Sequence, residues 1–378
     1  MTRPAVMRSW LAAPMPNDVE RAIERLSRAD DVCRIAVMPD VHLAEGVCVG
    51  MVVATRETLY PQAVGGDIGC GMAALRFDCD ADRLSDDHTA ARLLAGFHRT
   101  VPPIRHPTAT AVKQLPASLS DEALSHHRLE AMKMRDGRVE FATLGRGNHF
   151  LELQRCETGH VWLMLHSGSR AMGRAIFEHH REASGASPAA LFGLRSGSSA
   201  FQSYLGDVAW AIRYAEESRR TMVEAASQVI GDALGCSPEP ATLITCNHNH
   251  VQRETHFGED LLVHRKGSIH VPHAVQGIVP GSMGSPSFHV TGRGCADALD
   301  SSAHGAGRLL SRAEARRMVS RRDLARQMQG IWYDHRLEDH LRDEAPAAYK
   351  DVTSVMRAQS DLVRIARRLE PLLSYKAT

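Results

Sequence analysis

The sequence lacks the features that would place it in a membrane or make it a general binder of polyanions. No uninterrupted apolar stretch among its 378 residues approaches the roughly 18 that a spanning helix needs. The N-terminal residues contain no apolar signal-peptide core. The formal net charge is only +1 with histidine neutral, so any binding of nucleic acid must use a local basic patch.

A disulfide framework is missing as well. Eight cysteines are scattered between residues 33 and 295, which favours a reducing compartment, and we expect a cytoplasmic protein. The chain has no internal repeat, no low-complexity tract and no clear interdomain linker. Its 43% apolar and 24% charged residues are typical of a globular protein. We therefore predict one intertwined α+β domain over residues 1–378.

Hydrophobic periodicity predicts the order of the elements. A capping box at Asn17–Glu20 is expected to open a first helix, and further capping boxes at Ser311 and Ser320 to open two short ones. Residues 85–135 are expected to form a peripheral helical segment broken at Pro102 and Pro103, and the Gly-, Pro- and Ser-rich residues 273–294 an ordered active-site loop. The other expected helices cover residues 170–183 and 203–230, and the expected strands cover 34–38, 47–55, 72–77, 148–154, 160–166, 243–246 and 261–264.

Residue types that ligate metals lie in turns rather than in periodic runs. Asp67 and Cys70 share a turn with four glycines, and His149, His166 and His248 have asparagine, serine or glycine neighbours. Because glycine lets the backbone approach a ligand, we expect these side chains to converge on one polar pocket. The expected hairpin puts His149 and His166 at opposite ends of its chain path, so the two would meet if the strands shear.

Five such ligands exceed the needs of one tetrahedral ion. Two ions sharing the Cys70 sulfur would use them all, and ion pairs of this kind flank a phosphoryl group during in-line displacement. Ligand softness leaves both Zn²⁺ and Mn²⁺ open. The alternative is that Cys70 is a small buried apolar residue and the histidines are hydrogen-bonded core or surface residues. Six further histidines in polar helical segments are expected to be exposed and without function: His126, His127, His179, His180, His335 and His340.

His304 differs from the other histidines because glycines follow it and a helix is expected to begin near Ser311. A loop rich in backbone N–H groups suits phosphate, and a neutral imidazole there could attack phosphorus and hold a nucleotide. A sixth metal ligand and a hydrogen-bonded loop histidine are the alternatives. Seven arginines from Arg308 to Arg326 favour a polyanionic substrate, although a solvated helix face explains such a run equally well.

Taken together, these segments resemble the RtcB family of RNA ligases. That family joins RNA ends bearing a 2',3'-cyclic phosphate or 3'-phosphate to ends bearing a 5'-hydroxyl. Lys376 extends the resemblance to the end of the chain, whereas Arg146 and residues 266–270 depart from the family pattern. The matching stretches are Met38–His42, Gly65–Met72, Leu144–Glu152, His166–Arg170, His248–Asn249, Pro280–Gly284, Ser302–Arg308 and Asp343–Lys350.

The resemblance implies a single α/β domain whose central sheets surround a dinuclear metal pocket, with two Mn²⁺ ions and GTP as cofactors. One ion would be held by Asp67, Cys70 and His149, the other by Cys70, His166 and His248, and His304 would be the catalytic residue that carries GMP. Phosphate or RNA contacts would come from Asp40, Arg170, Lys266, Arg308 and Arg312. The implied guanylate pocket comprises Asn148, His149, Phe150, Leu151, Glu152, His248, Asn249, Pro280, Gly281, Ser282, Met283, Ser287, His304, Gly305, Ala306, Gly307, Tyr349 (a candidate to stack on guanine) and Lys376.

The implied reaction begins with attack of His304 on GTP, after which GMP passes to the RNA 3'-phosphate and is displaced by the 5'-hydroxyl, in tRNA splicing or RNA repair. The resemblance leaves open whether an accessory activating protein takes part. Two other functions are weighed against it. A dinuclear metal phosphodiesterase would need the metals but not His304, and a non-catalytic RNA-end-binding protein would keep the pocket for recognition alone.

Overall fold

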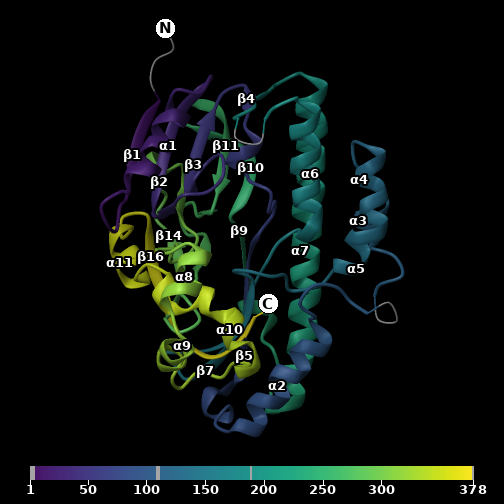
Figure 1. Ribbon diagram of the computed structural model, residues 1–378, viewed down its shortest axis with the longest axis vertical. Helices are drawn as coiled ribbons and strands as arrows, with labels where there is room; N and C mark the ends of the chain where they lie inside the picture. Colours follow the sequence, from purple (N-terminus) through teal and green to yellow (C-terminus); the bar gives the residue numbers. More distant parts are fainter. Residues whose placement is uncertain (1–4, 108–110, 188–189, 377–378) are drawn as a thin grey trace.

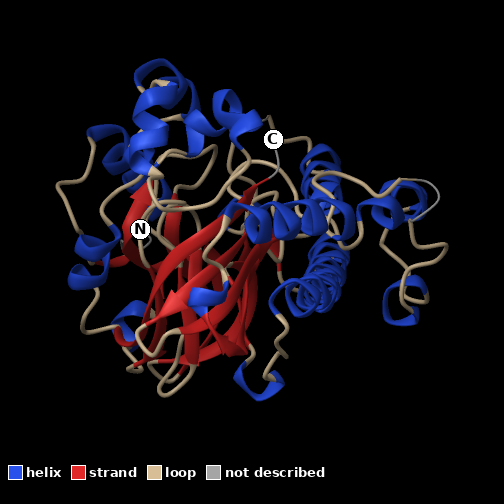
Figure 2. Ribbon diagram, turned by 90° about the horizontal axis from the view of Figure 1, so that it is seen from below, coloured by secondary structure: helices blue, strands red, loops and turns tan. Residues whose placement is uncertain are grey.

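The computed structural model describes residues 5–107, 111–187 and 190–376. Within these ranges the strands gather at the centre of the molecule and helices cover their flanks (Figures 1 and 2). The mixed α/β character expected from the sequence is therefore confirmed. No helix in the described ranges is both long and apolar enough to cross a bilayer.

A five-stranded sheet is formed largely by the N-terminal part of the chain. Helix α1 (Asn17–Ser27) covers it by burying Val19, Ile23 and Leu26, which recur on one side of the helix. Strand β1 is parallel to β2, and the other neighbours are antiparallel. The strand order is β1 (Val6–Ser9), β2 (Val32–His42), β3 (Val49–Thr55), β11 (Glu259–Lys266) and β10 (Asn249–His256).

A seven-stranded antiparallel sheet carries several of the residues predicted for the site, His166 among them. One face packs on α2 (Asp87–Thr100), α6 (Arg170–Ala183) and α7 (Ser199–Leu234), and the other buries Met72, Trp162 and Ile278. The long helix α7 runs along most of the molecule (Figure 1). The strand order is β13 (Gln276–Val279), β14 (Ser287–Gly292), β16 (Val363–Lys376), β6 (Phe150–Cys156), β7 (His160–Ser167), β5 (Gly71–Asp80) and β9 (Ile244–Asn247).

Shorter elements complete the described ranges. Capping boxes at Ser311 and Ser320 open α8 and α9 as expected. The two small sheets pair β12 (Ser268–His270) with β15 (Ser301–Ala303) and β4 (Thr58–Leu59) with β8 (Leu194–Arg195). The remaining helices are α3 (Ala117–Ser120), α4 (His127–Met132), α5 (Arg138–Glu140), α8 (Arg312–Met318), α9 (Arg321–Gln327), α10 (Glu338–Leu341) and α11 (Val352–Ala358), with short 3₁₀ or π turns at Pro61–Ala63, Ala81–Arg83, Lys133–Gly137, Pro240–Thr242, Ala296–Ala298, His335–Leu337, Arg342–Glu344 and Pro346–Ala348.

Two expected boundaries are wrong. Helix α1 begins after Pro16, which has no side-chain oxygen to cap it, so the expected capping box at Asn17–Glu20 does not form. The strand expected to end at residue 38 continues through Pro39 to His42. Proline is tolerated there because the register of β2 against β3 shifts between Val37 and His42, which relieves Pro39 of donating to the ladder.

The loop expected over residues 273–294 is shorter than predicted, because its flanks form strands β13 and β14 and only residues 280–286 connect them. Two of its glycines mark close packing within these strands. A Cβ at Gly277 would lie 2.6 Å from Ile269 Cδ1, and a Cβ at Gly292 would lie 2.0 Å from the carbonyl oxygen of Val271. Glycine inside a strand often marks such an approach, which the composition alone did not reveal.

His180, expected to be exposed, is buried. It follows Met172 and Ile176 on the inner face of α6, and its Nε2 lies 2.7 Å from a carboxylate oxygen of Asp207 on α7. Asp207 also accepts hydrogen bonds from the backbone N–H and the hydroxyl of Ser125, at 2.8 and 2.6 Å. One buried carboxylate thus connects α6, α7 and the chain that enters α4.

The Asp207→Ala variant should lower the free energy of unfolding by about 2–4 kcal/mol, because it leaves buried donors without an acceptor. Urea denaturation followed by circular dichroism measures the change. The control is Asp232→Ala, which removes an exposed carboxylate from the same helix and should change stability by less than about 0.5 kcal/mol. Equal losses of unfolding free energy in the two variants would show that Asp207 does not hold α6 and the chain before α4 against α7.

Candidate metal and nucleotide site

Five ligand side chains meet in two groups that share one sulfur. Cys70 Sγ lies 3.4 Å from His149 Nε2 and 3.2 Å from His166 Nε2. His149 Nε2 is 3.1 Å from an oxygen of Asp67, and His166 Nε2 is 3.3 Å from His248 Nε2. Within each group, Asp67–Cys70–His149 and Cys70–His166–His248, the ligand atoms all lie within 4.8 Å of one another. Each group could hold one metal ion.

The turn that carries Asp67 and Cys70 requires glycine at two positions. Gly69 has φ of +70° and lies against α7, where a Cβ would be 2.9 Å from Ile212 Cα. A Cβ at Gly71 would lie 2.3 Å from the carbonyl oxygen of Cys246 on β9. The turn is therefore pressed between a helix and a strand, and this close fit directs the Cys70 sulfur toward the histidines.

His149 and His166 come together without any shear of their strands. Phe150, the residue after His149, pairs directly with His166 in the β6–β7 register. The two histidines were expected to meet only if the strands sheared. No shear is needed, because the two ends of a hairpin's chain path lie side by side in space. His166 is fixed further through Nδ1, which lies 3.1 Å from the carbonyl oxygen of Asn148.

The protonation chemistry of this cluster suits a cation. Burial lowers the pKa of His166 and of His248 well below the ordinary value. Their imidazoles are therefore neutral, and each can offer a ring-nitrogen electron pair to a metal ion. Burial opposes ionisation of Asp67, but His149, Cys70 and His166 together outweigh it and lower the pKa to about 2. Burial and Asp67 raise the pKa of the Cys70 thiol well above its usual range. A bound cation supplies the positive charge that a thiolate needs at this depth.

His304 is held by a buried carboxylate. Its Nδ1 lies 2.7 Å from Asp40 Oδ2, which also accepts from the His304 backbone N–H at 3.2 Å. The His304 and His248 ring centroids are 4.7 Å apart. Because Asp40 engages Nδ1, Nε2 is the nitrogen available for chemistry. Asp40 was expected to contact phosphate or RNA, but its carboxylate is fully buried on His304 instead.

A cavity of about 340 Å³ opens in front of the cluster. It is also lined by His42, Val49, Gly65, Gly66, Gly267 and Glu344, for which the sequence suggested no role. The structure thus brings together most of the residues predicted for nucleotide and phosphate binding. Those that line it are Asp67, Cys70, Asn148, Phe150, Glu152, His166, His248, Asn249, Lys266, Pro280, Gly281, Ser282, Met283, His304, Gly305, Ala306, Gly307, Arg308, Arg312, Tyr349 and Lys376.

Several predicted residues lie elsewhere. The Leu151 side chain enters the hydrophobic core, because strand alternation turns it away from the face that Phe150 and Glu152 present. Ser287 is buried behind the cavity, where its hydroxyl accepts the Gly281 N–H at 3.1 Å. Arg170 donates to the Thr143 hydroxyl at 3.2 Å. His149 does not line the cavity, although its Nε2 lies 3.1 Å from the Asp67 carboxylate, which does.

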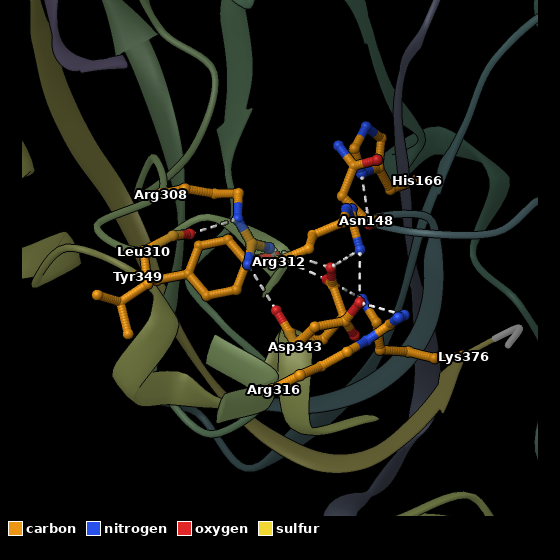
Figure 3. A network of polar contacts seen from close by, with 10 residues as sticks. Asn148, His166, Arg308, Leu310, Arg312, Arg316, Asp343, Tyr349 and Lys376 are labelled. Atoms are coloured by element: carbon orange, nitrogen blue, oxygen red, sulfur yellow. Dashed lines mark hydrogen bonds and ion pairs between the residues drawn. The ribbon is translucent and has the colours of Figure 1, made fainter. Parts of the chain in front are cut away.

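A buried carboxylate, Glu344, is shared by basic side chains that line the cavity. Figure 3 shows Arg308, Arg312, Tyr349 and Lys376 within this network of polar contacts. Glu344 accepts from Arg308 at 3.2 Å and Arg312 at 2.6 Å, and from the Tyr349 hydroxyl at 2.7 Å, while Lys376 Nζ lies 3.0 Å away. Burial opposes its ionisation, but Lys376 and Arg312 lower its pKa. Sequence reasoning gave Glu344 no role of its own, since the matching stretch Asp343–Lys350 does not show which remote side chains its carboxylate meets.

Two more charged groups in the lining are strongly perturbed. Glu152 receives hydrogen bonds from Gln154 at 3.0 Å and Ser374 at 3.1 Å, yet burial raises its pKa to about 7. Burial lowers the pKa of Lys266 to about 8. The Lys266 ammonium donates to the carbonyl oxygens of Glu45 and Val47, at 3.0 and 2.6 Å, so it is already engaged by backbone.

Comparison with known proteins identifies the family of this chain. The family model described as tRNA-splicing ligase RtcB matches residues 23–377. The RNA-splicing ligase RtcB of Escherichia coli strain K12 is 34% identical, with 99% of this chain and 98% of the relative covered.

Two further relatives come from other sources. The RNA-splicing ligase RtcB of Mycobacterium tuberculosis is 30% identical, with 89% of this chain and 95% of the relative covered. The RNA-splicing ligase RtcB2 of Escherichia coli strain ATCC 25922 is 27% identical, with 91% of this chain and 88% of the relative covered. Because the family match spans nearly the whole chain, the chain belongs to the RtcB family of RNA-splicing ligases, which are enzymes.

Proposed function

We propose that the protein uses GTP and two divalent cations, Mn²⁺ by the family resemblance, to join RNA 3'-phosphate or 2',3'-cyclic-phosphate ends to 5'-hydroxyl ends. The observation that carries this proposal is the His304 ring, which is hydrogen-bonded to Asp40 at 2.7 Å and lies tilted beside the His248 ring, with the ring centroids 4.7 Å apart. A phosphodiesterase would need the cluster, but it would not need a second, carboxylate-held imidazole that faces the same cavity.

The donor set fits a pair of cations. Asp67, Cys70 and His149 would hold one, and Cys70, His166 and His248 the other. Buried Nδ1 atoms of His149 and His248 make no hydrogen bond within the described ranges, whereas their Nε2 atoms face the cluster. When bound, the cations would neutralise charge on the phosphoryl oxygens. Sulfur, nitrogen and oxygen donors together admit Mn²⁺ as well as Zn²⁺.

His304 performs the first step. Its Nε2 forms a bond to the α-phosphorus of GTP while the bond from that phosphorus to pyrophosphate breaks, leaving GMP on the imidazole. Positive charge develops on the ring as this bond forms. Asp40 accepts a hydrogen bond from the Nδ1–H group and stabilises that charge, as a buried carboxylate does for a catalytic imidazole in other enzymes.

The RNA ends react in the following steps. Water first opens a cyclic phosphate, and an oxygen of the RNA 3'-phosphate then takes GMP from His304 Nε2. The 5'-hydroxyl attacks the activated 3'-phosphorus, so that a phosphodiester forms and GMP leaves. Arg308, Arg312 and Lys376 line the same cavity. Phosphates of RNA or of the nucleotide would bind these positively charged side chains, which also contact Glu344.

Glu152 is the group best placed to select guanine. It lies in the cavity lining with a carboxylate that accepts hydrogen bonds, and guanine presents N–H donors on its Watson–Crick edge where adenine presents an acceptor. Lys376 would balance the Glu152 charge, since it is the largest influence that opposes burial there. Tyr349 lines the cavity, but its hydroxyl is bonded to Glu344, and we propose that its ring packs beside the base.

The His304→Ala variant should lose all protein-linked GMP while retaining its bound metal. The test is incubation of the full chain with α-labelled GTP and Mn²⁺, followed by denaturing electrophoresis and acid treatment, because a phosphorus–nitrogen bond is acid-labile. The control is His335→Ala, which removes an exposed histidine outside the cavity. Labelling that persists in the His304 variant would refute the guanylylation step. Hydrolysis of phosphodiesters without labelling would support a phosphodiesterase, and RNA binding without either would support an RNA-end binder.

The Asp40→Asn variant should form the same adduct about 10²-fold more slowly, because the amide keeps the shape of the side chain but removes the charge that stabilises the imidazolium. Single-turnover guanylylation across a range of pH measures the effect. Replacement of Asp361, an exposed carboxylate bonded to Trp10, is the control. A wild-type rate in Asp40→Asn would show that the carboxylate has no part in the step.

The Glu152→Gln variant should gain stability relative to the wild type as pH rises from 5 to 8. The folded-state pKa is raised from 4.5 to about 7, so the stability contributed by protonated Glu152 is full below about pH 4.5 and is lost as pH rises through 7. The difference should reach about 2–3 kcal/mol by pH 8. Urea unfolding at several pH values measures it, with the exposed Glu370→Gln as control. A difference that does not vary with pH would show that Glu152 ionises freely.

A further inference from the structure

A buried arginine lies behind the ligand cluster, on the side away from the cavity. Arg219 sits in the middle of α7 and is 2% exposed. One terminal nitrogen donates to the carbonyl oxygens of Gly69 and Ser167, each at 2.8 Å. The other donates to the side-chain oxygen of Asn247.

Each of these three acceptors is the immediate chain neighbour of a ligand. They adjoin Cys70, His166 and His248 respectively, which form one of the two ligand groups. The three ligands come from the turn before β5, the end of β7 and the segment after β9. A single planar guanidinium therefore connects three separate segments at the points where they carry their ligands, and its fork geometry fixes the spacing between them.

The backbone around Arg219 leaves little room for adjustment. A Cβ at Gly69 would lie 3.2 Å from the Ala215 side chain and 3.3 Å from the Ala211 carbonyl oxygen, so the turn rests directly on α7. The His248 N–H donates to the Cys70 carbonyl at 2.8 Å, and the Gly69 N–H donates to the Asn249 carbonyl at 2.8 Å. These bonds join the first and third segments to each other, and Arg219 adds the second through Ser167.

Every hydrogen bond that Arg219 donates within the described ranges goes to a neutral oxygen. Cys70 and Glu216 interact favourably with its charge, and Glu216 itself accepts from the Asn247 amide at 2.6 Å. A guanidinium beside a metal site repels the incoming ion, and burying it costs free energy. The three geometrically matched hydrogen bonds offset part of that cost.

We infer that Arg219 is a positioning residue that sets the distances among Cys70, His166 and His248, and so the affinity of the cation site they form; this rests on the proposed two-cation function. Arg219 makes no hydrogen bond to the chain neighbours of Asp67 or His149 within the described ranges, so the second ligand group depends on it only through Cys70. Loss of Arg219 should therefore weaken the Cys70–His166–His248 site much more than the Asp67–Cys70–His149 site.

Two variants separate geometry from charge. Arg219→Met keeps the length of the side chain without donors, and Arg219→Lys keeps the charge but replaces the planar fork with a single ammonium. Arg220→Met is the matched control, since Arg220 is the next residue on α7 and pairs with Glu217 and Glu224 at the surface. Cys70→Ala, which removes the shared sulfur, is the reference for loss of both sites.

The probe is Co²⁺ titrated into the full chain, followed by the sulfur-to-cobalt absorption band and by equilibrium dialysis. Wild type and Arg220→Met should bind two ions. Arg219→Met should bind one ion with near-normal affinity and the second about 10–100-fold more weakly, and Arg219→Lys should fall between them. Two ions at wild-type affinity in both Arg219 variants would overturn the inference. A wild type that binds fewer than two ions would instead refute the two-cation function.

A metal-free crystal structure of Arg219→Lys supplies a second readout that does not depend on any ion. The separations of Cys70 Sγ from His166 Nε2 and of His166 Nε2 from His248 Nε2, now 3.2 and 3.3 Å, should increase, while the contact of His149 with Asp67 stays near 3.1 Å. Unchanged separations, with only a lower melting temperature, would show that Arg219 stabilises the fold without positioning the ligands.

Discussion

The site depends on the close fit of one glycine-containing turn between helix α7 and strand β9. Gly69 and Gly71 allow approaches that any side chain would block, and the residue between them is Cys70. Its sulfur thereby reaches two imidazoles from separate strands, at 3.4 and 3.2 Å. Every other part of the site is arranged around this sulfur, because both ligand groups contain it.

Buried charges compensate one another in the cavity lining, in a chain whose net charge is only +1. Glu344 contacts Arg308, Arg312 and Lys376, and Asp40 holds His304. Each acid fixes the position of the groups it contacts while lowering the cost of burying them. The basic character is therefore local and oriented rather than spread over the surface.

Local sequence signals predicted the ligand turns, because glycine, asparagine and histidine in irregular segments indicate close backbone approach. Most of the cavity lining was predicted only through the resemblance to the RtcB family. The local signals could not reveal the partners. Asp40 lies 264 residues from His304, and Arg219 lies 150 residues from Gly69. Asp40 stands in a stretch that resembles the family, but nothing near it indicates His304 as its partner, and Arg219 has no distinctive neighbourhood. The strands at the flanks of 273–294 and the burial of His180 were missed for a related reason, since the packing partner that decides each case is remote in sequence.

The most direct test of the central claim is a crystal structure of the chain grown with Mn²⁺ and GTP, with anomalous diffraction recorded at the manganese edge. The account predicts two anomalous peaks, one on each side of the Cys70 sulfur, and continuous density from His304 Nε2 to the phosphorus of GMP. Manganese bound away from that sulfur, or an unmodified His304 ring beside intact GTP, would contradict it.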